Sequence, residues 1–338
     1  MYKLIRLLLF KLDPETAHHL TLQLMRIGGV QPINLILKTI YAAPPKPVQA
    51  FGLTFKNPIG LAAGYDKDGI AVRGLSTLGF GHVEVGTVTP RPQPGNPKPR
   101  VFRLVDDEAV INRMGFPGKG ADFVSRQLIA ISGHQSTVLG LNLGKNKDTP
   151  LEEAANDYIS LMRTFAPLAD YLAINISSPN TVGLRRLQDR EMLEYLLGEI
   201  NRSRIANHWS TPILVKLAPD LADDELDDAL GAILDSGMDG VIATNTTLAR
   251  EGLRSKHRDE TGGLSGGPLG VRSEAVLEKI VRRVDGKIPI VSVGGIMTPE
   301  DAKRRLDMGA TLIQLYTGLV YRGPSLVKMI LQALASVS

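Results

Sequence analysis

The chain has 338 residues and a formal net charge of +4, and 43% of its residues are hydrophobic. This length is sufficient for one large α/β domain with an appendage, and the slight basic excess by itself excludes little. The absence of cysteine excludes disulfides, thiolate metal sites, iron–sulfur clusters and a cysteine nucleophile within this chain.

A basic and strongly apolar segment opens the chain. Residues 1–11, MYKLIRLLLFK, predict a short helix. Asp13 caps a second predicted helix with Pro14 at its first position, and Gly28-Gly29 ends it. The two helices predict a helical hairpin. Either this hairpin caps the following domain with its apolar face, or it dips into a bilayer interface, as helices with basic residues among large aliphatics do.

The chain divides into two predicted parts. A Pro-rich stretch at 43–47 is typical of a stiff linker, so residues 1–47 form the hairpin with its linker and residues 48–338 form the main domain. No stretch approaches the roughly 18 apolar residues of a membrane span. No small-residue cleavage site follows the first apolar run. The sequence therefore predicts a cytoplasmic protein, either soluble or peripheral.

From about residue 57 the chain repeats one theme: a short apolar run, a Gly- or Asn-rich loop, and a segment with helical spacing. Strands are predicted at 59–63, 82–87, 138–143, 171–176, 213–217, 240–244, 288–293 and 311–316. Helices are predicted at 69–78, 120–131, 151–166, 190–206, 222–236, 273–284, 299–308 and 325–335. Eight such units predict an α/β fold of the closed (β/α)8 type, a TIM barrel with an N-terminal helical hairpin.

A doubly wound open sheet is the alternative architecture. Its dinucleotide fingerprint, G-x-G-x-x-G, is absent from residues 60–64 after the first strand. Residues 118–120 also lack the spacing and hydroxyl of a phosphate-binding Walker loop. The sequence therefore favours the barrel.

Polar residues follow the carboxyl ends of the predicted strands, which face one shared site in a barrel. The fullest example is residues 175–181, NISSPNT, where amides and hydroxyls replace the residues that a strand needs. A single run of this kind is most simply an ordinary loop. Comparable runs recur, however, at 62–69, 86–89, 112–116, 142–146, 216–219 and 244–247. Together they predict a ligand-binding surface.

Two glycine-containing turns predict a phosphate site. Gly294-Gly295 follows the seventh strand and Thr317-Gly318 the eighth. Loops at these positions of a barrel expose backbone N–H groups toward a helix N-terminus and commonly bind phosphate. Glycine in a tight turn explains either pair alone, but the combination indicates a phosphorylated ligand or cofactor.

Lys216 lies within the otherwise apolar strand 213–217, where an unpaired ammonium is costly to bury. A structural ion pair is one explanation, although Asp66 is the only acidic residue predicted at a strand end. A reduced flavin, whose ring develops negative charge, is another suitable partner. Lys67 and the Asn-rich loops suit a planar, anionic substrate with many hydrogen-bonding edges.

The sequence contains no histidine that is a candidate base or metal ligand. The six histidines form no i, i+4 pair and none lies at a predicted strand end, so we interpret them as surface or satisfied core residues: His18, His19, His82, His134, His208 and His257. Ser178 becomes the candidate base, a hydroxyl that its neighbours must activate. Strand alternation is expected to point Ser177 away from the site that Asn175 faces. A serine before proline also commonly serves only to form a turn.

The combined motifs resemble those of quinone-dependent (class 2) dihydroorotate dehydrogenase, a flavin enzyme family of pyrimidine synthesis. The resemblance extends from the N-terminal hairpin to Gly323. It rests on NPIGLAAGYDKDG (57–69), NRMGF (112–116), NLGKNK (142–147), NISSPNT (175–181), VKLAPD (215–220), ATNTT (243–247), GGLSG (262–266) and SVGGI (292–296). Class 1 relatives use a cysteine base, and this chain has none.

The resemblance implies oxidation of dihydroorotate to orotate in UMP biosynthesis, with FMN as hydride acceptor and a membrane quinone as final electron acceptor. It implies FMN contacts from Ala62, Ala63, Gly64, Thr87, Asn142, Asn175, Lys216, Thr244, Gly266, Gly295, Tyr316 and Thr317. It implies substrate contacts from Lys67, Asn112, Arg113, Met114, Gly115, Phe116, Asn175, Asn180, Asn245 and Thr246. Ser178 would be the catalytic base and would take a proton from the ring carbon next to the amide carbonyl.

The resemblance also implies a location. Residues 1–40 would form the quinone entrance and seat the protein on the cytoplasmic face of the inner membrane, as a peripheral protein. It implies no metal and no nucleic-acid partner. Two positions depart from the family pattern and bear on cofactor packing: Tyr65, where an aliphatic residue is expected, and Gly267, where a longer side chain is usual.

Two other functions account for less of the sequence. An FMN hydroxy-acid oxidase requires a histidine base near the flavin, and none is found at a strand end. A catalytically silent barrel docked on membranes is compatible with the fold, since fold does not dictate function. A yellow protein whose flavin spectrum bleaches with dihydroorotate would support dihydroorotate oxidation, and a colourless protein would favour the silent barrel.

Overall fold

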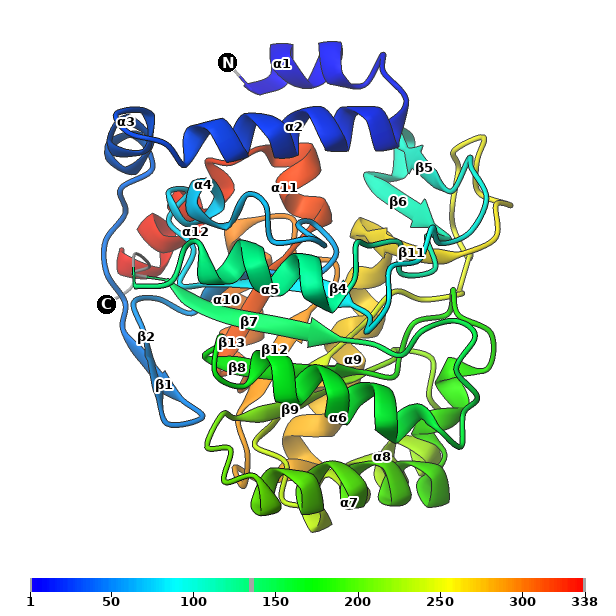
Figure 1. Ribbon diagram of the computed structural model, residues 1–338. Coiled ribbons are helices and arrows are strands. Elements are labelled where there is room, and N and C mark those ends of the chain that lie inside the picture. The colour runs from blue at the N-terminus through cyan, green and yellow to red at the C-terminus, as the bar shows by residue number, and fades with distance from the viewer. Residues whose placement is uncertain (1, 134–136, 337–338) are drawn as a thin grey trace.

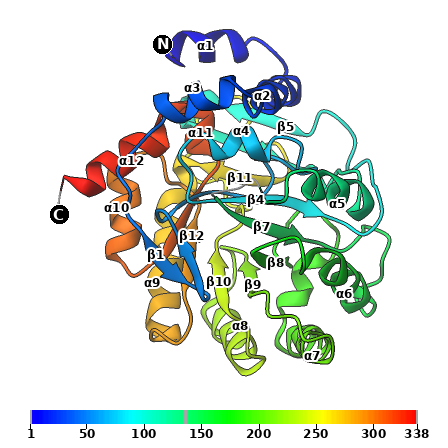
Figure 2. The ribbon, with the colours of Figure 1, turned by 60° about the vertical axis from the view of Figure 1, so that its left-hand side comes forward.

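The computed structural model describes residues 2–133 and 137–336, so the prediction for His134 falls outside the described residues. Eight parallel strands close into a barrel in the order β10-β12-β13-β3-β4-β7-β8-β9 (Figures 1 and 2). They are β3 (Ile59–Leu61), β4 (His82–Val88), β7 (Val138–Leu143), β8 (Tyr171–Asn175), β9 (Ile213–Leu217), β10 (Gly240–Ala243), β12 (Ile290–Val293) and β13 (Leu312–Leu315). The predicted (β/α)8 barrel is confirmed.

Helices surround the barrel, as Figure 2 shows. They are α4 (Val72–Ser76), α5 (Ala121–Ile129), α6 (Ala154–Phe165), α7 (Arg190–Ala206), α8 (Asp223–Asp235), α9 (Gly270–Val284), α10 (Pro299–Asp307), α11 (Thr317–Arg322) and α12 (Leu326–Ala335). The short α11 was not predicted, because six residues are too few to display a helical period. Helix α4 begins three residues later than predicted, since the Asp66 carboxylate accepts the N–H groups of Ile70 and Ala71 and holds a turn there.

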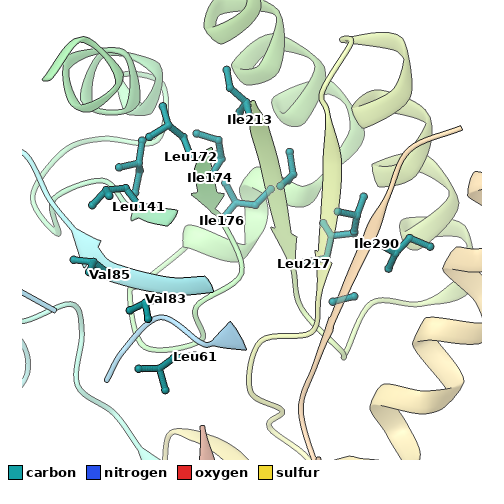
Figure 3. Packing of buried hydrophobic residues seen from close by; sticks show 14 of the residues in the cluster. Leu61, Val83, Val85, Leu141, Leu172, Ile174, Ile176, Ile213, Leu217 and Ile290 are labelled. Carbon is teal, nitrogen blue, oxygen red and sulfur yellow. The ribbon is translucent and has the colours of Figure 1, made fainter. Parts of the chain in front are cut away.

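Alternate strand residues build two separate cores. In β9, Ile213, Val215 and Leu217 belong to the large core between barrel and helices, part of which Figure 3 shows. Leu214 belongs to a smaller core inside the barrel. This two-sided burial explains why the strands read as nearly continuous apolar runs. It also means that a polar residue at an even-numbered position of β9 points toward the barrel axis.

A hairpin of β1 (Val48–Ala50) and β2 (Leu53–Phe55) closes the amino-terminal end of the barrel. Phe55 is fully buried, its ring 5.5 Å from that of His82, while Phe51 lies against Tyr171. At the other end, β5 (Val101–Leu104), β6 (Ala109–Asn112) and β11 (Gly263–Gly266) form a small antiparallel sheet. Neither small sheet was predicted. Because the hairpin blocks one end, a ligand reaches the barrel from the carboxyl end of its strands.

Three helices precede the barrel: α1 (Tyr2–Leu9), α2 (Pro14–Gly28) and α3 (Ile33–Ile40), drawn in blue in Figure 1. The first two match the predicted helices, and Asp13 caps α2 by accepting the N–H groups of Glu15 and Thr16 at 3.0 Å. Helix α3 was not predicted, and none of its residues is buried. Helix α2 packs closely on α4, where a Cβ at Gly74 would lie 1.7 Å from the Met25 carbonyl oxygen.

Candidate active site at the carboxyl end of the barrel

One cavity of about 420 Å³ opens at the carboxyl end of the strands and extends to α1 and α2. It collects nearly all the residues that the sequence singled out. Its lining includes Ser178, Ala62, Ala63, Gly64, Thr87, Asn175, Lys216, Thr244, Gly266, Gly295, Tyr316, Thr317, Lys67, Asn112, Met114, Gly115, Phe116, Asn180, Asn245 and Thr246. Asn142 and Arg113 are the predicted residues that do not line it.

A network of amides and one hydroxyl forms the cavity floor. Asn175 Nδ2 donates to Thr87 Oγ1 at 3.0 Å and to Asn142 Oδ1 at 2.9 Å. Thr87 Oγ1 donates to the same Asn142 oxygen at 2.6 Å. Asn142 therefore lies beneath the floor, where it orients Asn175 and Thr87. These three residues come from the ends of β8, β4 and β7, which the barrel closure brings side by side.

Lys216 has an acidic partner that sequence reasoning missed. Its Nζ lies 3.6 Å from Glu84 Oε1, and both side chains are buried. Asp66 was the only acidic residue predicted at a strand end, whereas Glu84 lies in the middle of β4 and points into the barrel. Asp66 instead holds the turn before α4, and burial raises its pKa to about 6. The alternation of β4, HVEVGTV, was the available signal for Glu84.

Ser178 faces the cavity, and its Oγ accepts a hydrogen bond of 3.2 Å from the Asn180 N–H. Ser177 lies in the wall, where its hydroxyl donates to Asn175 Oδ1 at 3.1 Å and accepts from Asn245 Nδ2 at 2.9 Å. The alternation argument for Ser177 was wrong, because residues 175 and 177 are two positions apart and therefore share one side of an extended chain, where the Ser177 hydroxyl contacts the Asn175 amide. The structure nevertheless places Ser178, not Ser177, on the cavity.

Arg185 fixes the loop that carries these serines, a role that the sequence did not reveal. Its Nε donates to the Ser177 carbonyl at 3.1 Å and its Nη2 to the Thr246 carbonyl at 2.9 Å. Its Nη1 pairs with Asp220 at 2.9 Å. One guanidinium therefore ties together the loops that follow β8, β9 and β10.

Lys67 provides a positive charge at the mouth of the cavity. Its Nζ donates to the Gly64 carbonyl oxygen at 2.6 Å, and burial lowers its pKa to about 8. Asn180 Nδ2 donates to Asn112 Oδ1 at 3.2 Å on the same cavity. Arg113 turns away, with Nη1 on Glu260 at 2.7 Å and its guanidinium over the Phe102 ring. Its side chain therefore contacts the sheet and loop outside the cavity.

Closely packed glycines form the end of the cavity where a phosphate site was predicted. A Cβ at Gly295 would lie 2.2 Å from Gly270 Cα at the start of α9, and Gly295 has a φ of +74°. Ser265 Oγ and Thr317 Oγ1 lie 2.8 Å apart at the same end. Ser265 was not predicted, although it stands within the GGLSG motif.

A buried arginine beneath this end was also not predicted. Arg305 is fully buried and its Nη2 donates to the carbonyl oxygens of Gly294 and Gly270, both at 3.0 Å, and to Ser273 Oγ at 2.7 Å. It therefore fixes the turn after β12 against the start of α9. Nothing in the period of α10 distinguishes Arg305 from the exposed arginine before it, so this contact could not be predicted from local sequence.

Two histidines differ from their predicted surface or satisfied core roles. His18 of α2 lines the cavity, and burial lowers its pKa to about 3, so it is neutral near pH 7. His82 is buried, but its Nδ1 has no hydrogen-bond partner.

Tyr65 is one of the two positions that depart from the family pattern. Its ring packs against those of His18 and Tyr316, with centroids 5.1 Å and 6.0 Å away. At the other departure, Gly267, a Cβ would lie 3.4 Å from the Asp107 carbonyl oxygen, an ordinary contact.

Across residues 2–133 and 137–336, no group of three or more His, Cys, Asp or Glu side chains is placed to hold a metal ion. Within the same ranges, no helix has both the length and the apolar character needed to cross a membrane.

The fold and the site define a TIM-barrel enzyme with its active site at the carboxyl rim of the strands. A family model described as dihydroorotate dehydrogenase matches residues 47–337. A "Dihydroorotate dehydrogenase (quinone)" of Roseiflexus sp. (strain RS-1) is 50% identical and covers 99% of this chain and 93% of its own length. The protein with the same description from Escherichia coli O1:K1 / APEC is 48% identical, and the match covers 97% of this chain and 98% of its own length.

The crystal structure of the Eimeria tenella enzyme in complex with ferulenol is similar, with a TM-score of 0.86 and 38% identity, covering 96% of this chain and 91% of that one. The chain therefore belongs to the dihydroorotate dehydrogenase family of oxidoreductases, in its quinone-dependent branch.

Proposed function

We propose that this protein oxidises dihydroorotate to orotate for UMP synthesis, with FMN as hydride acceptor and a membrane quinone as final electron acceptor. The observation that carries the proposal is that one cavity gathers Ser178, Lys67, Lys216, the amide floor and the glycine turns. Its curated relatives carry the description dihydroorotate dehydrogenase (quinone).

The residues present fit FMN. The Gly295 turn and Thr317 offer backbone and hydroxyl donors for a phosphate, and the close approach of Gly295 to Gly270 leaves no space for a side chain there. The flat part of the cofactor would lie over the amide floor beside Lys216. Ala62, Ala63, Gly64, Thr87, Asn142, Asn175, Lys216, Thr244, Gly266, Gly295, Tyr316 and Thr317 form this proposed cofactor site, with Asn142 acting from below the floor. When bound, FMN supplies a two-electron acceptor for hydride.

Lys67 and the asparagines are proposed to hold the substrate. Lys67 would pair with its carboxylate, while Asn112, Asn180 and Asn245 present amide groups to its ring. Residues 113–116 complete the proposed substrate set, Arg113 through its position in the loop rather than its side chain. Thr246 and Asn175 contribute from the ends of neighbouring strands.

Ser178 is proposed to act as the base. Its Oγ would take the proton from the ring carbon next to the amide carbonyl while hydride leaves the neighbouring carbon, and the ring double bond of orotate forms between the two. The Asn180 N–H, 3.2 Å from Oγ, would stabilise negative charge that builds on this oxygen. Burial of Ser178 at the cavity wall keeps water away from the proton transfer.

Residues 1–47 are proposed to provide membrane contact and quinone access, and residues 48–338 to form the FMN-binding barrel. The cavity continues between the helices, where Ile5, Leu9, Leu24 and Met25 line it. The outer surfaces of α1 and α2, together with α3, expose large apolar side chains, among them Leu4, Leu7, Leu8, Leu20, Ile27, Leu35, Ile36 and Ile40. An apolar patch of this kind favours peripheral attachment to a membrane, which we place at the cytoplasmic face.

The test is a spectrum of the purified protein. We expect a yellow protein whose flavin absorbance bleaches when dihydroorotate is added without oxygen and returns when a short-chain quinone is added. A colourless protein that takes up no added FMN, or a flavin that dihydroorotate leaves unchanged, would contradict the proposal.

A further inference from the structure

Glu84 is a fully buried carboxylate beneath the cavity floor, in the interior of the barrel. Three side chains donate hydrogen bonds to it. Asn142 Nδ2 donates to Oε1 at 2.8 Å, while Tyr171 OH and Gln314 Nε2 donate to Oε2 at 3.0 Å and 2.7 Å. Lys216 Nζ lies 3.6 Å from Oε1. Every polar contact of Glu84 is thus a donor or a cation, which is the environment of an ionised carboxylate.

Glu84 and Lys216 occupy different depths in the barrel. Lys216 lines the cavity, whereas Glu84 does not. A ligand above the floor therefore meets the ammonium first and the carboxylate behind it. In the low dielectric of a buried site these two charges act on a ligand together, and the carboxylate opposes what the ammonium alone would do.

Asn142 links the pair to the floor. The same side chain accepts from Thr87 and Asn175 through Oδ1 and donates to Glu84 through Nδ2. Glu84 therefore fixes the orientation of the floor amides as well as the charge below them. No step of the proposed reaction uses it as an acid or base, because it does not reach the cavity.

We propose that Glu84 is a positioning residue that acts through Lys216 and lowers the reduction potential of the bound flavin. This rests on the proposed function. Two-electron reduction places negative charge on the flavin, which Lys216 stabilises and Glu84 opposes. An enzyme that must pass its electrons on to a quinone benefits from a flavin that does not hold them too tightly.

The test compares the reduction potentials of the flavin in the wild-type holoenzyme and in Glu84→Gln, measured against a reference dye. The amide keeps the size of the carboxylate but removes its charge. We expect the ratio of reduced to oxidised flavin at a fixed potential to rise at least tenfold, which corresponds to about 30 mV for a two-electron couple. Reoxidation by a short-chain quinone should slow relative to reduction by dihydroorotate.

The matched control is Asp157→Asn, a buried carboxylate on α6 that accepts from Asn146 N and Thr149 Oγ1 and does not line the cavity. We expect its flavin ratio to stay within about threefold of wild type. A similar rise in this control would show that the change in Glu84→Gln is not specific to the pair with Lys216, and would contradict the proposal.

A second variant serves if Glu84→Gln fails to fold or to hold flavin. The double variant Glu84→Gln/Lys216→Met removes both charges, a replacement that buried ion pairs often tolerate. The reference for this double variant is Lys216→Met, which differs from it only at Glu84. We expect the ratio of reduced to oxidised flavin to be at least threefold higher in the double variant than in Lys216→Met, because the opposing charge of Glu84 is gone. Equal ratios in these two variants would refute the role of Glu84. A wild-type protein without flavin would contradict the proposed function instead, whereas an unchanged potential in flavin-bearing Glu84→Gln contradicts only this inference.

Discussion

The Lys67 ammonium lies 2.6 Å from the Gly64 carbonyl oxygen. The side chain that we propose to bind the substrate carboxylate is therefore held by the first barrel loop before any substrate arrives. Burial lowers the pKa of Lys67 to about 8, while Glu15 acts to raise it. Lys67 is therefore charged below about pH 8 and loses its charge above it. We expect the affinity for orotate to be constant near pH 7 and to fall as the pH rises through about 8.

This prediction is checked by titrating the flavin absorbance with orotate from about pH 6 to about pH 10. Lys67→Gln should bind orotate at least tenfold more weakly at pH 7 and lose the dependence near pH 8, because the titrating group is gone. Affinity that stays flat in the wild type, or that rises with pH, would contradict a charged contact at Lys67.

Ser178→Ala should retain flavin and orotate binding and lose turnover by about 10²- to 10⁴-fold, the usual contribution of a positioned base. Rapid mixing with dihydroorotate measures flavin reduction directly. The control is Ser177→Ala, which removes hydrogen bonds to Asn175 and Asn245 but leaves the cavity hydroxyl in place. We expect it to weaken substrate binding more than it slows reduction. Equal rates of reduction in Ser178→Ala and wild type would remove Ser178 as the base.

Arg305→Met should weaken the binding of FMN at least tenfold while changing the binding of riboflavin little. The reason is that Arg305 holds the carbonyl groups of Gly294 and Gly270, and riboflavin has no phosphate to be bound at that turn. Fluorescence titration of flavin-free protein measures both affinities. Arg304→Met is the matched control on the same helix, since Arg304 is about half exposed and pairs with Glu274 and Asp301 on the surface. Equal losses for the two flavins would indicate general destabilisation rather than a phosphate turn.

Leu7→Ser/Leu8→Ser should reduce association with phospholipid vesicles. The two side chains are 60% and 66% exposed on α1, and burying a leucine in an apolar phase is worth about 1.5–3 kcal/mol. Loss of both should therefore weaken binding more than tenfold, measured by cosedimentation with vesicles. Ile205→Ser is the control, because Ile205 is 65% exposed on α7, on the opposite side of the molecule from α1 (Figure 1). Equal binding of the three proteins would contradict attachment through α1.

Local sequence determined much of this molecule. The apolar runs and the loops between them predict the eight barrel strands within one or two residues at most ends, because strand and turn preferences act between near neighbours. Asp13 was identifiable as a helix cap for the same reason, since its partners lie two and three residues away. The strand-end residues of the site followed from the barrel, because that architecture places all carboxyl ends at one rim.

Only the tertiary structure decided which inward-facing residues meet. Glu84 and Lys216 are far apart in the sequence and lie on β4 and β9, which are not neighbours in the sheet, yet closure of the barrel brings both to its axis. The contacts of Arg305, and of His18 with the cavity, likewise depend on how separate elements pack. Local patterns show that a residue is polar and which side of its element it occupies. They do not contain the distance across the barrel, which sets the partner of a buried charge.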